Sequence, residues 1–272
     1  MNARQVHAVL AAGVENPGLI ARWRREPQLL RSYGIEPDTV DLDGLWKFAG
    51  LTVKVRHNAI REDLPLTFRL MSVAGLEIEI FAAYAGDRAS KGARYASTAE
   101  ARACDLVDFL EHWLDLERPG HSLLWDMLRH ERALAQLTKS APPSGPGAER
   151  VGGPRTAPSS ATLPRVRGKI ILHEMRSDPR AVGAALRASA PRLPGVLLEP
   201  AYFCYWRADA AKEISIVQLD AFGFYILSFV DGARSAADLN RELGGGKKPT
   251  RAFLQLLGEL GALGILELGR PR

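Results

Sequence analysis

Hydrophobic positions recur with a helical period through the first half of the chain. A short helix is expected at residues 4–12. A second helical stretch at 17–33 begins with Asn16 as a capping residue and Pro17 at the first helical position. Pro27 interrupts that stretch, because proline lacks the amide donor and clashes with the preceding turn, so we expect two short helices there.

Further helices are expected up to residue 138. Ser97 and Glu100 have the spacing of a capping box at the start of an amphipathic helix, and a last helix is expected at 122–137. These helical periods predict an all-α domain over residues 1–138. The positions that share helical faces are Leu42, Leu45, Ala49, Thr52, Val53 and Arg56, then Leu66, Leu70, Val73 and Leu76, and then Ala103, Leu106, Val107, Leu110, Trp113 and Leu114.

Residues 139–164 have no hydrophobic periodicity and are dense in Pro, Gly, Ser and Ala. Such a segment buries too little apolar surface to offset the entropy lost on ordering. We therefore expect a flexible linker between two domains.

The pattern changes again after the linker. A β-like run at 169–172 and a short helix at 179–188 come first. Strands rich in Val, Ile and aromatic residues are then expected at 196–199, 203–207 and 213–219. Three helices follow, and a run at 265–268 is expected to add a wing strand. The apolar faces of these helices consist of Phe222, Ile226, Leu227 and Val230, of Leu239 and Leu243, and of Phe253, Leu256, Leu257 and Leu260.

Composition narrows the class of protein only slightly. Hydrophobic residues make up 46% of the chain and charged residues 25%, which is ordinary for a protein with packed cores. The net charge of +5 is compatible with nucleic acid, an acidic peptide or an acidic protein, and it selects none of them. Two distant cysteines, no apolar run of roughly 18 residues and no signal-peptide pattern lead us to expect a cytoplasmic protein.

The residues that most often carry chemistry have no recognisable arrangement. None of the six histidines has a spacing that places two metal ligands on one helical face. The run GGGKKPT at 244–250 does not meet the phosphate-loop spacing. Cys104 and Cys204 lie in apolar surroundings, which favours packing over nucleophilic chemistry. We therefore assign no catalytic residue, no metal ligand and no cofactor to this chain.

Two features point instead to binding. Arg22, Arg24 and Arg25 surround Trp23 in one basic helical turn. The turn is either a solvated face with the tryptophan inward or a contact for a partner. The second feature is the run EISIVQL at 213–219, which contains neither Pro nor Lys. If it is the last strand of a three-stranded sheet, its free edge is available to bind another strand.

The second half of the chain resembles the RiPP recognition element, a fold typified by the pyrroloquinoline-quinone peptide chaperone. The resemblance covers about the last 80 residues. It is carried by GVLL at 195–198, FCYW at 203–206, ISIVQLD at 214–220, VDG at 230–232, SAADL at 235–239 and the helix at 253–266.

The first half resembles the partner proteins of multinuclear non-haem iron-dependent oxidases, as found in methanobactin-, thiaglutamate- and bufferin-type systems. The segments that carry this resemblance are LRHERAL at 128–134, WKFAGL at 46–51 and RHN at 56–58. The long linker and the loose fit of the first 40 residues depart from that family.

Together the two resemblances imply an α+β protein. Residues 1–138 would be an all-α domain that contacts the oxidase through Arg22, Trp23, Arg24 and Arg25. Residues 165–272 would be a winged-helix-like recognition element. The chain would bind the leader of a ribosomally made precursor peptide and present its cysteine-containing core, while the oxidase supplies the iron. The implied leader contacts are Glu213, Ile214, Ser215, Ile216, Val217, Gln218, Leu219, Arg251, Leu254 and Gln255.

Two alternatives remain open from the sequence. A winged-helix DNA-binding regulator also has a small sheet and three helices, but the helix at 250–261 contains only one basic residue. A free-standing enzyme with an unrecognised site is the other. Bound metal or turnover by the purified chain would indicate such an enzyme.

Overall fold

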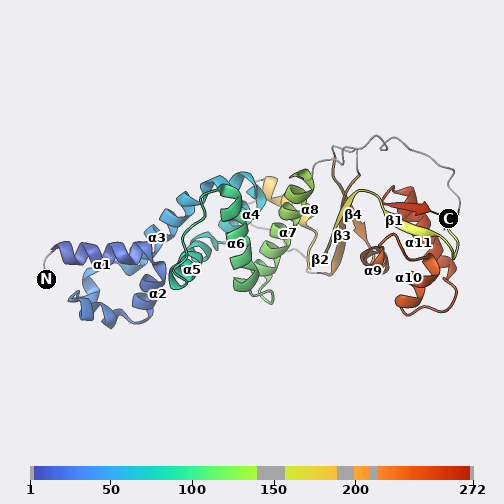
Figure 1. Cartoon of the computed structure of the whole chain (residues 1–272). Helices are drawn as coiled ribbons and strands as arrows, with labels where there is room; N and C mark the ends of the chain where they lie inside the picture. Colours follow the sequence, from blue (N-terminus) through green and yellow to red (C-terminus); the bar gives the residue numbers. More distant parts are fainter. Residues whose placement is uncertain (1–2, 140–156, 189–198, 209–212, 270–272) are drawn as a thin grey trace. The chain divides into compact units, whose positions relative to one another are not determined.

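The computed structural model describes residues 3–139, 157–188, 199–208 and 213–269. The chain is an α+β protein that forms two compact units, whose elements are labelled in Figure 1. The first unit comprises Met1–Leu128 and Pro179–Val196, and the second comprises Arg129–Asp178 and Leu197–Arg272.

The first unit is helical throughout its described residues. Asn16 caps α2 through its side chain and Pro17 occupies the first turn, as expected. The interruption at Pro27 is also confirmed. Thr98, not Ser97, caps the amphipathic helix α6, because its hydroxyl accepts the amide of Ala101. The helices are α1 (Ala3–Glu15), α2 (Pro17–Arg25), η1 (Pro27–Tyr33), η2 (Pro37–Thr39), α3 (Leu42–Arg56), η3 (Asn58–Glu62), α4 (Pro65–Val73), α5 (Glu77–Ser90), α6 (Ala99–Trp113), the first part of α7 (Pro119–Lys139) and α8 (Pro179–Arg187).

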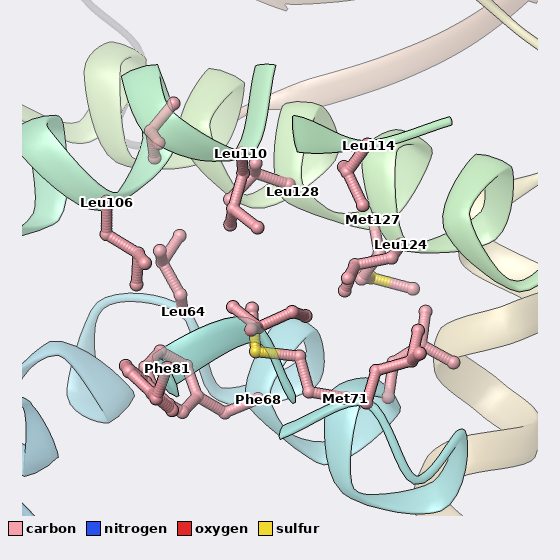
Figure 2. Close-up of a cluster of buried hydrophobic side chains, with 14 of the residues drawn as sticks. Leu64, Phe68, Met71, Phe81, Leu106, Leu110, Leu114, Leu124, Met127 and Leu128 are labelled. Atoms are coloured by element: carbon pink, nitrogen blue, oxygen red, sulfur yellow. The ribbon is translucent and has the colours of Figure 1, made fainter. Parts of the chain in front are cut away.

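Two hydrophobic clusters hold the first unit together. The smaller one joins α1, α2 and α3 around Ile20, Trp23 and Leu30. The larger one joins α4 to α8, and Figure 2 shows its leucines, methionines and phenylalanines meeting between the helices. Val182 and Leu186 of α8 are buried in this larger cluster, so α8 belongs to the helical unit although it follows the expected linker.

The second unit contains a three-stranded antiparallel sheet in the order β2-β3-β4. These strands are β2 (Lys169–Met175), β3 (Ala201–Arg207) and β4 (Ser215–Leu219). The expected strand at 196–199 is not the first strand of the sheet. That strand is β2, residues 196–198 lie outside the described residues, and Glu199 precedes β3.

Both faces of this sheet are covered within the second unit. Side chains alternate between the two faces along each strand. Phe203 and Tyr205 of β3 pack with Ala133 and Leu137 of α7. Cys204 packs on the opposite face against the helices α9 (Ala221–Phe229), α10 (Ala236–Glu242) and α11 (Arg251–Ala262).

A second small sheet involves the end of the expected linker. Strand β1 (Leu163–Val166) pairs with β5 (Leu266–Gly269), the wing strand expected after α11. Just before β1, the carbonyl groups of Ser160 and Thr162 accept the amides of Ala237 and Ala236 at 3.0 and 2.8 Å. The ordered chain therefore resumes inside the expected linker, of which residues 140–156 lie outside the described residues.

Candidate functional site

Strand β4 is an edge strand of the three-stranded sheet. It pairs only with β3 among the described strands, with Ile216 opposite Tyr205 and Gln218 opposite Phe203. Proteins protect such edges with proline, lysine or bulges, and Ser215–Leu219 contains none of these. No second described strand pairs with this edge of β4.

Strand β2 forms the other edge and differs from β4. It begins at Lys169, a residue type that blunts sheet edges. The guanidinium of Arg129 in α7 also donates to the carbonyl of Glu174, at 2.7 Å. Charge and a side-chain hydrogen bond therefore protect β2, and β4 is the better edge for strand addition.

Helix α11 comes close to the end of β4 at Leu256. A Cβ on Gly223 would lie 3.8 Å from both Leu219 Cβ and Leu256 Cδ1. The end of α11 lies towards β2 instead, because the carbonyl of Ile265 accepts the amide of Arg167, two residues before β2, at 2.8 Å. The flank of α11 that carries Leu256 therefore borders the end of β4.

Apolar side chains are exposed along this flank. Phe222, in the first turn of α9, is 44% exposed and packs edge-on against Phe253, with ring centroids 6.1 Å apart. Leu263 is 52% exposed at the end of α11, and the half-buried Leu256 lies seven residues before it on the same side. We call Phe222, Leu256 and Leu263 the apolar flank. Such exposed apolar groups beside an open edge are typical of a peptide-binding surface.

The expected leader contacts are only partly gathered here. Ser215, Ile216, Val217, Gln218 and Leu219 form β4, and Glu213 and Ile214 directly precede it. Arg251 is exposed at the start of α11, and Gln255 is exposed and donates to Glu259 at 2.9 Å.

Leu254 lies on the other flank of α11. It is two residues from Leu256, which places the two side chains about 200° apart around the helix. Gly258, one turn after Leu254, faces Pro158, whose ring would lie 3.6 Å from a Cβ at that glycine. Leu256, not Leu254, is therefore the leucine of α11 that borders β4.

The expected partner contact at residues 22–25 needs one correction. Trp23 is only 2% exposed, because Gly13 of α1 leaves room for its ring inside the smaller cluster. Arg24 is held by Asp43 at 2.7 Å, and its guanidinium lies 5.4 Å from the Trp46 ring centroid. Trp23 is thus a core residue, and only the arginine side chains of this turn reach the surface.

A different surface of the first unit is apolar and exposed. Phe48, Leu51 and Val55 of α3 are 58%, 50% and 66% exposed, and their spacing places them on one helical face, which we call the α3 stripe. Phe48 also lines a pocket of about 350 Å³, together with Leu10, Val40, Leu45 and other residues. The helical period of the sequence predicts the buried face of α3 but not this second apolar face, whose signal is the 48, 51, 55 spacing.

Groups with redox or metal-binding chemistry are scattered. No cluster of three His, Cys, Asp or Glu side chains suited to a metal ion occurs among the described residues. Burial raises the pKa of the Cys204 thiol to about 12, so this thiol stays protonated and is a poor nucleophile near neutral pH. Cys104 is exposed on α6.

Comparisons with known proteins identify no relative. No protein-family model matches the chain, and no curated protein matches it. Within the described residues, no helix combines the length and apolar character that crossing a bilayer requires. The features of the chain that indicate a function are therefore the edge of β4, the apolar flank and the α3 stripe.

Proposed function

We propose that this protein is the non-catalytic accessory subunit of a heterodimeric peptide-modifying oxidase. In this role the second unit binds the leader of a ribosomally made precursor peptide, and the partner is a multinuclear non-haem iron oxidase that holds the iron. The observation that carries the proposal is the unprotected edge of β4 beside the apolar flank. A sheet edge offers main-chain hydrogen bonds to an extended peptide, and the flank offers contacts for its side chains.

The expected affinity follows from the size of this surface. A leader strand beside the five residues of β4 forms four or five main-chain hydrogen bonds, each contributing about 0.5–1.5 kcal/mol net. Burial of the exposed parts of Phe222 and Leu263 adds about 1 kcal/mol for each side chain. After the cost of ordering the peptide, binding near micromolar affinity, about −8 kcal/mol, is a reasonable upper expectation.

We further propose that the three-stranded sheet with α9, α10 and α11 is a winged-helix-like recognition element. In such an element the leader lies between the third strand and the third helix. Leu256 of α11, which borders the end of β4, would then contact leader side chains. Lys247, Lys248 and Arg251 are exposed at the start of α11 and would attract an acidic leader at long range.

The first unit is proposed to contact the oxidase through the α3 stripe. Three exposed apolar side chains on one helical face offer side-chain burial but no main-chain hydrogen bonds, which suits a folded partner surface. Arg22 and Arg25 are exposed in the same unit and would supply charged contacts at the rim of that interface.

The direct test is a titration of the full chain with the small peptide encoded beside its gene. Consecutive residues of an antiparallel strand direct their amides to opposite sides, so Ile216→Pro and Val217→Pro differ in which amide they remove. One variant loses an amide of the free edge and is expected to bind the leader at least tenfold more weakly while remaining folded. The other loses an amide directed at β3 and is expected to be less stable. Equal leader affinity for both variants and the parent protein would contradict the edge-strand proposal.

A winged-helix DNA-binding regulator is the alternative. The pairing of β5 with β1 after α11 is the feature that favours it, because a wing also follows the recognition helix in that fold. However, the exposed positions of α11 include Glu259 and only one cation, Arg251. A gel-shift assay at several salt concentrations separates the two: specific, salt-dependent binding to DNA would favour the regulator.

A further inference from the structure

A second pocket in the first unit has a composition that neither the leader site nor the α3 stripe explains. It has a volume of about 420 Å³ and lies between the last turns of α5 and the helix α6. Three aromatic rings follow one another along it: Tyr84 and Phe109 have centroids 5.3 Å apart, and Phe109 and Trp113 are stacked at 6.2 Å. Its lining also includes the carboxylates of Asp87, Asp105 and Asp108 and the cations of Arg88 and Lys91.

Of the three carboxylates around this pocket, two form ion pairs and one does not pair with any described residue. Arg88 pairs with Asp105, and Lys91 pairs with Asp87, both at 2.8 Å. Asp108 is exposed and forms no ion pair with any described residue. With His112 counted as neutral, the charged groups of the lining therefore sum to −1. The Nδ1 atom of His112 is hydrogen-bonded to the main-chain carbonyl of Asp108 at 2.8 Å.

A buried hydroxyl lacks a partner at the same place. Tyr84 is only 1% exposed, and no described residue forms a hydrogen bond with its hydroxyl. Burial raises the pKa of this phenol well above its usual value, and the charged groups that act on it include Arg88, Asp105 and Asp87 of the pocket lining. A buried polar atom without a partner costs about 1–3 kcal/mol. This hydroxyl is enclosed by protein atoms, so the aromatic rings and the carboxylate of Asp108 determine which ligand fits the pocket.

The buried Nε of Arg88 has a different explanation. The guanidinium carbon of Arg88 lies 6.0 Å from the Tyr84 ring centroid and 5.6 Å from that of Tyr95. Its Nε, which lacks a hydrogen-bond acceptor among the described residues, therefore has aromatic rings as neighbours. Arg88 positions Asp105 and shields the inner wall, and it does not by itself create an anion site against three carboxylates.

We propose that this pocket binds the guanidinium group of an arginine side chain presented by a protein partner. A planar guanidinium packs against the half-buried rings of Phe109 and Trp113 and donates to the exposed Asp108 carboxylate. The fit requires a cation that is flat and has several donors, which distinguishes arginine from the compact ammonium of lysine. Every lining residue belongs to the first unit, so the inference does not depend on leader binding by β4.

The test uses a capped arginine and its neutral isostere. The full chain is titrated with N-acetyl-arginine-N-methylamide and with N-acetyl-citrulline-N-methylamide, and the indole resonance of Trp113 is followed by NMR. We expect at least tenfold tighter binding of the arginine compound, because citrulline keeps the shape but lacks the charge. Free L-arginine is the third probe, and we expect it to bind no more tightly than the capped compound, as a site for a side chain within a polypeptide requires.

Two variants assign the effect to the pocket. Asp108→Asn is expected to weaken capped-arginine binding about fivefold, as for the loss of a partly exposed charge pair. Glu111→Gln removes an exposed carboxylate of the same helix outside the pocket lining and is expected to change binding less than twofold. Tyr84→Phe is expected to change binding less than twofold without lowering stability, since the hydroxyl it removes is enclosed and has no described partner.

Three results would overturn the proposal. Equal binding of the arginine and citrulline compounds would show that the pocket does not recognise charge. Equal losses in Asp108→Asn and Glu111→Gln would show only a general electrostatic attraction. Tighter binding of free L-arginine than of the capped compound would identify a metabolite site instead of a protein contact.

Discussion

The two units expose apolar surface in different ways. In the first unit, Phe48, Leu51 and Val55 project from a helix whose main chain is already hydrogen-bonded internally. In the second, the apolar flank borders the end of β4, which is the last strand of the described sheet. An apolar helical face offers side-chain burial alone, which suits a folded partner, whereas a sheet edge can bind the main chain of a peptide. In the function proposed above, the α3 stripe would therefore contact the folded oxidase and β4 would bind the extended leader.

The largest expected effect tests how much the three-stranded sheet depends on the main-chain geometry just before β2. Gly168, between β1 and β2, has a φ of 83°, and a Cβ there would overlap the main chain of Arg207 and Ala208. Gly244 has a similar φ of 81° with nothing within 4 Å of a Cβ. In urea unfolding we expect Gly168→Ala to cost about 3 kcal/mol or more, and Gly244→Ala about 1 kcal/mol. Equal costs would show that the approach of Gly168 to β3 does not constrain the sheet.

The next effect tests the α3 stripe against the basic turn. The double change Leu51→Glu and Val55→Glu places charges on exposed positions and is expected to weaken capture of the co-expressed oxidase at least about 100-fold, as for loss of interface anchors. The matched control is Arg22→Glu with Arg25→Glu, also on exposed helical positions, for which we expect less than about tenfold. Both pairs should leave the circular dichroism spectrum unchanged. If the arginine pair has the larger effect, the basic turn and not the stripe is the contact.

A third effect depends on pH and on the second unit. Burial, followed by the nearby charges of Arg129 and Arg132, lowers the pKa of His173 to about 4, and the neutral ring accepts a hydrogen bond from Arg129 at 2.9 Å. The unfolded chain binds this proton near pH 6.5, so stability is fully present above that pH and is lost as the pH falls towards 4. Between pH 6.5 and 4.5 we expect the His173→Gln variant to lose about 2 kcal/mol less than the parent protein. Identical pH profiles in urea titrations would contradict this assignment.

The smallest effect separates the two flanks of α11. Leu254 and Leu256 are both half-buried, so replacement of either by alanine should cost similar stability. Leader affinity should fall about tenfold in Leu256→Ala and less than about threefold in Leu254→Ala, because only Leu256 borders β4. The reverse order in a calorimetric titration would place the leader on the Pro158 side of α11.

Some of this architecture was predictable from the sequence, and some was not. The β4 run and the capping of α2 depend on neighbouring residues, and the structure shows both of them. The identity of β2 as the first strand was missed, because it depends on pairing between residues about 30 positions apart.

The site itself shows the same limit. Trp23 and Phe48 are both large and follow a helical period, but only tertiary packing decides that Trp23 is buried beside Gly13 and Phe48 is exposed. Leu254 and Leu256 are likewise the same residue type in the same helix, and they differ only in that Leu256 lies on the flank of α11 that borders β4. Local patterns thus predict which elements form, whereas exposure depends on contacts between distant segments.

The central claim is strand addition at β4, and a backbone N-methyl scan of the leader peptide tests it most directly. Methylation of a single amide removes one donor without changing the protein or the leader side chains. If the leader adds to β4, alternate amides face the sheet, so affinity should fall about tenfold at every second leader residue and change little at the residues between. A loss that is uniform along the leader, or that follows a helical period of three to four residues, would contradict the account.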